Sequence, residues 1–117
     1  MSTVRVGIVG LGIMGEMYAD ALQEMQSAEV VAVATRSEER REMARSKYAC
    51  GTYSDYEEMY ANASLDAVLI TLPDFLHRDP VVKAAEIGLH ILVEKPFATG
   101  VDDAEAMVRA IEKAGVK

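Results

Sequence analysis

The sequence predicts a doubly wound α/β fold: a parallel sheet of about five to six strands, covered by helices on both faces in three α/β/α layers. Apolar runs alternate along the chain with segments of helical spacing. Most connections are only a few residues long, which is typical of parallel strands joined by right-handed crossover helices. The chain has 117 residues, enough for one hydrophobic core, so residues 1–117 are expected to form a single domain.

Two strands and two helices are predicted in the first half of the chain. Val4–Val9 and Val30–Ala34 are continuous apolar runs, as expected for strands buried on both faces. Ile13–Gln26 between them has helical spacing. Ser37 is expected to cap a second helix, because its hydroxyl can accept a hydrogen bond from a free N–H of the first turn. The apolar stripe expected to bury the first helix comprises Met14, Met17, Tyr18, Ala21, Leu22 and Met25.

The middle of the chain contains one weak and one strong strand. The weak strand lies near Gly51–Tyr53. Ser54 and Glu57 are spaced as a capping box, which predicts that a third helix opens there. Asp66–Leu72, "DAVLITL", is the third strong strand.

The last third repeats the pattern of helix, strand and helix. The fourth helix is expected to begin between Leu76 and Pro80 and to end at Gly88, a suitable left-handed cap. His90–Glu94 reads as a strand. Thr99 is expected to cap the final helix, which runs through "DDAEAMVRAIEKA".

Composition excludes several kinds of partner. The formal net charge of −7 leaves no basic surface for nucleic acid. No apolar run approaches the roughly 20 residues that a membrane span needs, so no membrane partner is expected. Cys50 is the only cysteine, so the chain has no internal disulfide and fits a reducing cytoplasm. The sequence indicates no metal site.

Three glycines follow the first predicted strand and open the first helix, as Gly10-x-Gly12-x-x-Gly15. This spacing at this place indicates a dinucleotide site. Gly10 permits the tight turn, Gly12 lets a pyrophosphate approach the main chain, and Gly15 lets the helix pack close to the strand. Free N–H groups at the helix N-terminus let an acidic protein bind an anion. The alternative is a glycine turn that binds no ligand.

Thr35-Arg36-Ser37 follows the second predicted strand. NAD-binding domains commonly place an acidic residue there, whose carboxylate accepts hydrogen bonds from the adenosine ribose. A guanidinium can instead pair with a 2′-phosphate and stack on adenine. We therefore expect NADP to be preferred over NAD. Alternatively, Arg36 is a solvent-exposed charge whose attraction for phosphate is offset by Glu38 and Glu39.

Glu94-Lys95-Pro96 ends the strand that begins at His90. A lysine at the carboxyl end of a parallel strand points into the crevice where doubly wound sheets bind ligands. Its ammonium could donate to a substrate hydroxyl or polarise a carbonyl, so Lys95 is the candidate catalytic residue. The alternative is a surface charge followed by a proline that stops the strand.

Four stretches, "VGIVGLGIMG", "DAVLITLPDFLH", "GLHILVEKPFATGVDDAEAMV" and "AGVK", occur in the order and spacing of one group of enzymes. Over essentially its whole length, the chain resembles the N-terminal nucleotide-binding (Rossmann) domain of the Gfo/Idh/MocA oxidoreductases. The resemblance implies a nicotinamide-dependent dehydrogenase or reductase acting on a sugar, a cyclitol or a related hydroxyl or carbonyl compound. The cofactor-binding residues that it implies are Gly10, Gly12, Ile13, Met14, Gly15, Thr35, Arg36, Ser37, Thr71, Leu72, Pro73, His77, Glu94, Lys95 and Pro96.

The resemblance also implies roles for these residues. The three glycines would bind the pyrophosphate, and Thr35 and Arg36 would flank the adenosine ribose. Pro73 and His77 would line the nicotinamide side, although a helix cap or a surface residue explains His77 equally well. The Glu94-Lys95-Pro96 segment would border the active site.

Three positions depart from the family pattern or bear on the cofactor. Family members that use NAD often have an aspartate at the position of Thr35, which supports the preference for NADP. Leu72 replaces a common threonine, so a minor cofactor contact is expected to be missing. Tyr18 stands where a histidine is common, with little expected consequence for cofactor binding.

Family members continue into a second α/β domain that supplies the acid–base residues and forms the substrate pocket. Without it, the resemblance implies that Lys95 is not sufficient for catalysis and that a small-molecule substrate binds only when that domain is present. A missing neighbour also predicts an exposed edge at His90–Glu94 and self-association through it. Two alternatives remain: a stand-alone NAD(P)-binding sensor or interaction module, and a fragment that keeps the fold without binding cofactor.

Overall fold

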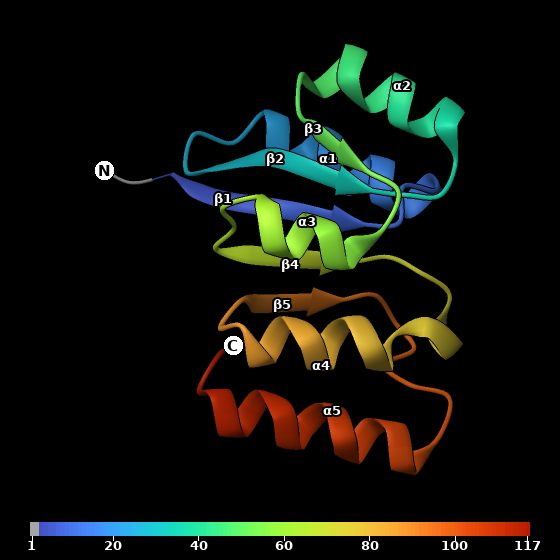
Figure 1. Cartoon of the computed structure of the whole chain (residues 1–117), viewed down its shortest axis with the longest axis vertical. Coiled ribbons are helices and arrows are strands. Elements are labelled where there is room, and N and C mark those ends of the chain that lie inside the picture. The colour runs from blue at the N-terminus through green and yellow to red at the C-terminus, as the bar shows by residue number, and fades with distance from the viewer. Residues whose placement is uncertain (1–2) are drawn as a thin grey trace.

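A computed structural model describes residues 3–117 of the chain and confirms the doubly wound α/β fold (Figure 1). Five parallel strands form one sheet in the order β3-β2-β1-β4-β5. The strands are β1 (Val4–Val9), β2 (Ala28–Ala34), β3 (Gly51–Tyr53), β4 (Ala67–Ile70) and β5 (His90–Val93).

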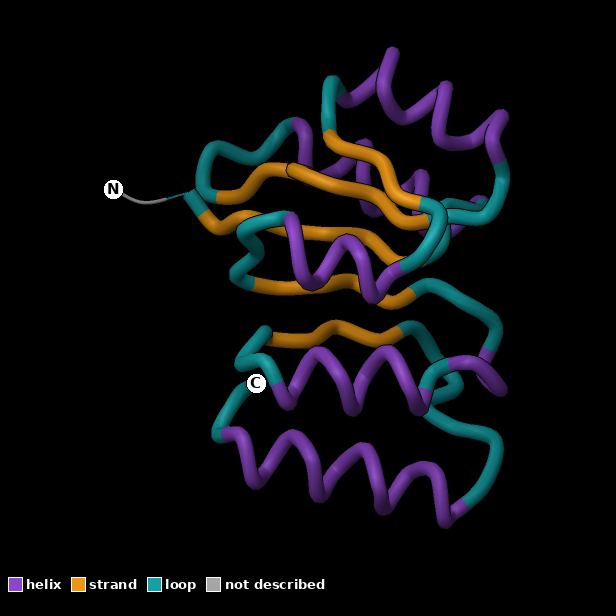
Figure 2. Tube along the Cα trace, viewed as in Figure 1, coloured by secondary structure: helices purple, strands orange, loops and turns teal. Residues whose placement is uncertain are grey.

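Helices cover both faces of this sheet, as Figure 2 shows in purple. α1 and α2 pack on one face, α3 and α4 pack on the other, and α5 lies along α4 at the outer end of the molecule. In the part of the chain that the structure describes, no helix combines the length and apolarity needed to cross a bilayer. The helices are α1 (Ile13–Gln23), α2 (Glu38–Tyr48), α3 (Tyr56–Asn62), α4 (Arg78–Glu86) and α5 (Val101–Ala114), with a short 3₁₀ helix at Asp74–Leu76.

The parallel register brings the ends of the central strands into one row. Val9 at the end of β1 pairs with Ala34 of β2 and with Ile70 of β4. One step further, the N–H of Gly10 donates to Ala34 O at 2.8 Å, and the N–H of Thr71 donates to Val9 O at 2.9 Å. The loops after these strands therefore leave the sheet at the same edge, where the predicted site residues lie.

The core consists of two apolar clusters, one on each face of the sheet. The first includes Ile8, Leu11 and Val33 and joins β1 and β2 to α1 and α2. The second includes Met59 and Ile70 and joins the sheet to α3, α4 and α5. A sheet that is buried on both faces explains the continuous apolar runs of its central strands.

The N-cap residue predicted from the sequence is confirmed for α2 but not for α3. The Ser37 hydroxyl accepts a hydrogen bond from the N–H of Arg40 at 3.2 Å, which confirms the predicted cap. The predicted cap at Ser54 is wrong, because Asp55 is the N-cap residue. Its carboxylate accepts from the N–H of Glu57 at 2.9 Å. Ser54 and Asp55 are adjacent in the sequence, and both residue types are good helix caps, so the sequence alone did not decide between them.

The predicted cap at Thr99 is also wrong. α5 begins after Gly100, which is extended and makes no side-chain cap. Instead, the carboxylate of Asp102 in the first turn stabilises α5 through its attraction to the positive end of the helix dipole. The other differences are shifts of boundaries: α1 ends at Gln23 rather than at Gln26, and the strand predicted at Asp66–Leu72 is shortened at both ends.

α1 buries only part of the predicted stripe: Tyr18 and Leu22 are partly buried against the core, whereas the methionines are exposed. Gly15 and Ala19 are the buried residues of this helix, whereas Met17 is 51% exposed and Met14 and Met25 are also exposed. Small residues four positions apart let the helix axis approach the sheet closely, so the buried line follows them rather than the larger side chains.

The edge of β5 is partly paired rather than fully exposed. The N–H of Ile91 donates to the carbonyl of Lys117 at 2.8 Å, and the N–H of Lys117 donates to His90 Nδ1 at 3.1 Å. The prediction of a wholly unpaired edge is therefore wrong at Ile91. Self-association through this edge stays a prediction.

Met107 anchors α5 to the core and provides a test of the outer layer. Its side chain is fully buried, whereas Val108 on the same helix is 42% exposed. We expect Met107→Ala to lower the free energy of unfolding by about 2–5 kcal/mol, because it leaves a cavity between α5 and α4. Val108→Ala should change it by no more than about 0.5 kcal/mol. Urea denaturation measures both, and equal effects would contradict this packing.

Candidate functional site

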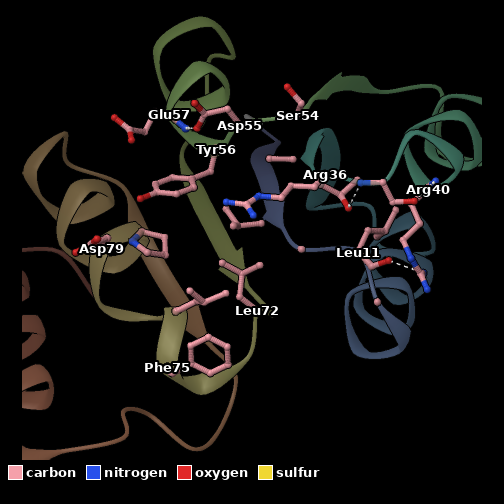
Figure 3. A pocket seen from close by; sticks show the side chains of 18 of the residues that line it. Leu11, Arg36, Arg40, Ser54, Asp55, Tyr56, Glu57, Leu72, Phe75 and Asp79 are labelled. Carbon is pink, nitrogen blue, oxygen red and sulfur yellow. Dashed lines mark hydrogen bonds between the residues drawn. The ribbon is translucent and has the colours of Figure 1, made fainter.

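A cavity of about 1040 Å³ lies at the edge of the sheet where the strands end (Figure 3). Its walls come from the glycine turn after β1, the segment after β2, the start of α3 and the loop after β4. The N-terminal part of α5 contributes Asp103. Segments far apart in the sequence thus meet around one opening, as expected at the carboxyl ends of a doubly wound sheet.

Two of the three glycines are required by the fold itself. Gly10 has a φ of +89°, a left-handed conformation that favours glycine. A Cβ at Gly15 would lie 2.5 Å from Gly10 O and 2.9 Å from Thr71 Oγ1, so any larger residue would push α1 away from β1. The Thr71 hydroxyl reinforces this contact, because it donates to Gly10 O at 2.6 Å.

Gly12 differs from the other two glycines. Its φ of −87° suits any residue, and a Cβ there would meet no atom within 4 Å. Gly12 is the N-cap of α1 but provides no capping side chain, so the first N–H groups of the helix have neither an intrahelical acceptor nor a side-chain cap. Nothing in the protein explains a glycine at this position, whereas close approach of an anionic ligand to the main chain does. The residues present therefore fit a dinucleotide diphosphate.

The structure brings Arg36 into the cavity. It extends from the end of β2 toward the wall that contains Tyr56 (Figure 3). Arg36 is exposed, and it makes no hydrogen bond or ion pair with any other residue between 3 and 117. Thr35 and Ser37 beside it also line the cavity.

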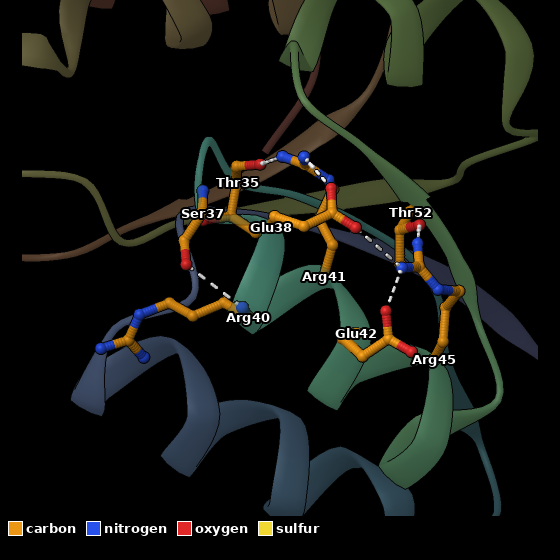
Figure 4. A network of polar contacts seen from close by, with 8 residues as sticks. All are labelled: Thr35, Ser37, Glu38, Arg40, Arg41, Glu42, Arg45 and Thr52. Atoms are coloured by element: carbon orange, nitrogen blue, oxygen red, sulfur yellow. Dashed lines mark hydrogen bonds and ion pairs between the residues drawn. The ribbon is translucent and has the colours of Figure 1, made fainter.

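Neighbouring arginines are held by other groups (Figure 4). Arg40 donates to Leu11 O at 2.7 Å and so ties the start of α2 to the glycine turn. Arg41 donates to Thr35 O at 2.7 Å and to the carboxylate of Glu38.

Glu38 does not oppose Arg36, contrary to the alternative considered from the sequence. Its carboxylate pairs with Arg41 and Arg45, and the hydrogen bond from Arg41 lowers the pKa of Glu38 below its ordinary value. The attraction of Arg36 for a phosphate is therefore not offset by this carboxylate.

Two predicted cofactor contacts after β4 have different surroundings. The Leu72 side chain lines the cavity, together with the exposed Phe75 (Figure 3). The Thr71 hydroxyl is already used by the main chain of the glycine turn, so its role here is to hold Gly10. Pro73 precedes the 3₁₀ helix and is not among the residues that line the cavity.

His77 is buried, being only 1% exposed, which corrects the alternative of a surface residue. It is the N-cap residue of α4, although its side chain makes no capping hydrogen bond. Its Nε2 lies 2.7 Å from Leu72 O, and its Nδ1 lies 3.1 Å from Phe97 O. Both ring nitrogens thus contact main-chain carbonyls, and the ring joins the loop after β4 to the segment after β5. The predicted place of His77 on the nicotinamide side stays a prediction.

Glu94, Lys95 and Pro96 lie at the same edge of the sheet but do not line the cavity. The carboxylate of Glu94 accepts from the hydroxyl of Tyr18 at 2.9 Å and from the N–H of Lys95 at 3.2 Å. Lys95 itself is exposed, and its peptide bond to Pro96 is cis.

Part of the cavity wall was not predicted from the sequence. Tyr56, Asp79 and Arg40 line it, although none was singled out. Tyr56 and Asp79 follow strands whose ends meet at this edge, which is a signal that could have indicated them. Arg40 carried no such signal, because its position on α2 matches that of any solvated helix charge.

Other reactive groups do not form a second centre. No cluster of metal-ligating side chains occurs within residues 3–117. Cys50 is a free thiol whose pKa is raised by burial, so it is a poor nucleophile at neutral pH.

His77 provides a direct test of this geometry. We expect His77→Ala to lower the free energy of unfolding by about 2–3 kcal/mol, because it removes the hydrogen bond that the ring donates to a main-chain carbonyl and opens a cavity. His90→Ala, at an exposed histidine, should cost no more than about 1 kcal/mol. Thermal unfolding of both variants measures the difference, and a stable His77→Ala protein would refute the structural role.

Comparison with known proteins places the site in a family. The sequence model described as "Oxidoreductase family, NAD-binding Rossmann fold" (GFO_IDH_MocA) matches residues 4–117. The chain is 34% identical over 116 residues to 2,7-anhydro-N-acetylneuraminate hydratase of Mediterraneibacter gnavus, covering 99% of this chain and 30% of that protein. It is 33% identical over 114 residues to scyllo-inositol 2-dehydrogenase (NADP(+)) of Bacillus subtilis, covering 97% of this chain and 35% of that protein.

A solved structure also matches the fold of this chain. The crystal structure of scyllo-inositol dehydrogenase from Lactobacillus casei, with bound NAD(H) and scyllo-inositol, matches with a TM-score of 0.95 and 26% identity. The match covers 99% of this chain and 35% of that chain. The chain thus spans about a third of the length of these relatives. Its fold, its glycine turn and its match over residues 4–117 show that the chain belongs to the Gfo/Idh/MocA oxidoreductase family, as an NAD-binding Rossmann domain.

Proposed function

We propose that this domain binds a dinucleotide, with a preference for NADP, and serves an oxidoreductase that acts on a hydroxyl or carbonyl group of a sugar or cyclitol. The observation that carries the proposal is the open space at Gly12, in front of the α1 N-terminus. The names of the relatives support the substrate class: scyllo-inositol 2-dehydrogenase (NADP(+)), myo-inositol 2-dehydrogenase and D-xylose 1-dehydrogenase (NADP(+)).

Diphosphate binding at this site depends on the main chain. The N–H groups of Ile13 and Met14 lie in the first turn of α1, and neither has an intrahelical acceptor. The positive end of the helix dipole adds to their attraction for an anion. This arrangement needs no lysine and agrees with a protein of net charge −7.

The preference for NADP rests on the segment after β2. Thr35 offers no carboxylate to repel a 2′-phosphate, and Arg36 is available in the cavity. Arg40 lines the same wall and adds positive potential there. An arginine pairs with phosphate through two parallel N–H donors, which makes it a strong and directional partner.

Catalysis is proposed to involve Lys95. A bound nicotinamide dinucleotide supplies hydride transfer to or from a carbon of the substrate. The exposed Lys95 ammonium can donate a hydrogen bond to the reacting oxygen, and Glu94 and Pro96 define the turn that presents it. The carboxylate of Glu94 accepts a hydrogen bond from the hydroxyl of Tyr18.

The second candidate function is a dinucleotide-binding module without turnover. It is favoured by the position of Lys95 outside the cavity. Mixing the chain with NADP and a panel of polyols, and recording the absorbance of reduced nicotinamide, separates the two. We expect binding without turnover for these residues alone.

A free thiol at Cys50 also favours a cytoplasmic location.

A matched pair of glycine variants tests dinucleotide binding. Gly12→Ala should leave the free energy of unfolding within about 1 kcal/mol of the parent, because its Cβ meets open space. It should weaken NADPH binding about tenfold or more, since the methyl group occupies the ligand's place. Gly15→Ala should instead destabilise the fold by about 1–3 kcal/mol, because its Cβ meets backbone.

Calorimetric titration and thermal unfolding of the same samples give both quantities. Unchanged NADPH affinity in a folded Gly12→Ala protein would overturn the proposed site. Destabilisation by Gly12→Ala equal to that by Gly15→Ala would contradict the difference between the two glycines.

A second pair tests the choice of cofactor. Arg36→Ala should weaken NADPH binding about 10- to 100-fold and NADH binding much less, because a charge-assisted hydrogen bond to the 2′-phosphate is lost. Arg45→Ala is the control, since Arg45 lies on α2 and pairs with Glu42 outside the cavity. Parent protein that binds NADH more tightly than NADPH would contradict the preference.

A further inference from the structure

Tyr18 makes a contact that the sequence did not indicate. Its hydroxyl donates to Glu94 Oε2 at 2.9 Å, although the two residues are 76 positions apart in the chain. Tyr18 lies on α1, and Glu94 is the first residue after β5. The bond therefore connects the first helix to the segment that carries Lys95.

The second oxygen of the same carboxylate continues the connection. Glu94 Oε1 accepts from the N–H of Lys95 at 3.2 Å. The main chain of Glu94 is held separately, because its N–H donates to Ile70 O at 2.9 Å. The sheet thus fixes the backbone of Glu94, while Tyr18 fixes the direction of its carboxylate and, through it, the Lys95 amide.

The helix that carries Tyr18 is also the helix that begins at the glycine turn. Tyr18 lies six residues after Gly12, about 9 Å along the helix axis. Gly15 between them packs against Gly10 O and leaves α1 little freedom to move. A rigid element therefore joins the proposed diphosphate site to the Glu94 carboxylate.

The chemistry of a phenol suits this role. The hydrogen bond to Glu94 raises the pKa of Tyr18 above its ordinary value, so the hydroxyl remains a donor throughout the neutral range. A tyrosine thereby holds the carboxylate without changing its own charge between about pH 5 and 8, where a histidine would titrate.

We propose that Tyr18 is a positioning residue, which acts through Glu94 to fix the turn that presents Lys95 relative to α1. The assignment of Lys95 to catalysis rests on the proposed function, whereas the Tyr18–Glu94–Lys95 connection does not. Tyr18 lies outside the cavity and is not assigned a contact with cofactor or substrate.

The test measures amide hydrogen exchange by NMR in the 117-residue chain. Tyr18→Phe removes only the hydroxyl, and we expect the Lys95 amide to exchange about fivefold faster, the effect of losing one ordinary hydrogen bond. The amides of Ala19 in α1 and Leu92 in β5 should keep their rates. In a Glu94→Ala background, Tyr18→Phe should have no further effect on Lys95.

Tyr48→Phe is the matched control. The hydroxyl of Tyr48 also donates to a carboxylate on α1, that of Asp20, at 2.8 Å. This variant loses the same kind of bond to the same helix and should leave Lys95 exchange unchanged. An unchanged Lys95 rate in Tyr18→Phe, or an equal increase at Ala19 and Leu92, would overturn the proposal.

NADPH titration of the same samples separates this inference from the proposed function. Tyr18→Phe should bind NADPH within about twofold of the parent, and a loss of tenfold or more would place Tyr18 in the binding site and overturn its role as a positioning residue. Parent protein that binds no NADPH would overturn the proposed function, while the exchange rates would still decide the connection.

Discussion

The close contact between α1 and the end of β1 determines how the rest of the site is arranged. A Cβ at Gly15 would lie 2.5 Å from Gly10 O, so the helix can approach the strand only because that side chain is absent. Thr71 then closes the turn from the neighbouring strand through its bond to Gly10 O. The result is a helix N-terminus that is held at the edge of the sheet, beside a cavity that Gly12 lines.

The groups that line the cavity at this edge of the sheet differ in charge from the protein as a whole. The protein carries a net charge of −7, yet the cavity contains main-chain donors and Arg36. The nearby arginines on α2 are used to hold structure: Arg40 ties α2 to the glycine turn, and Arg41 fixes the segment after β2. Among residues 3–117, Arg36 thus remains without a hydrogen-bond or ion-pair partner beside these held arginines, which net charge alone would not indicate.

The cavity at the glycine turn and the segment that carries Lys95 lie at the same edge of the sheet, but these two regions are built differently. The cavity at the glycine turn is formed by loops that follow several strands, whereas Lys95 is presented by a turn outside that cavity. Polar contacts connect the two regions: His77 joins the loop after β4 to Phe97, and Tyr18 joins α1 to Glu94. These contacts connect the cavity and the segment that carries Lys95 within one small domain.

The sequence by itself determined the doubly wound fold and the position of the glycine turn, because these follow from local periodicity and from glycines at a strand-to-helix junction. Tertiary structure alone decided which α1 residues are buried, that His77 is internal, and that Tyr18 meets Glu94. These features depend on how closely elements that are distant in the chain approach one another. That distance cannot be predicted from a local pattern of residue types. For the same reason, only the structure distinguished the available Arg36 from its paired neighbours.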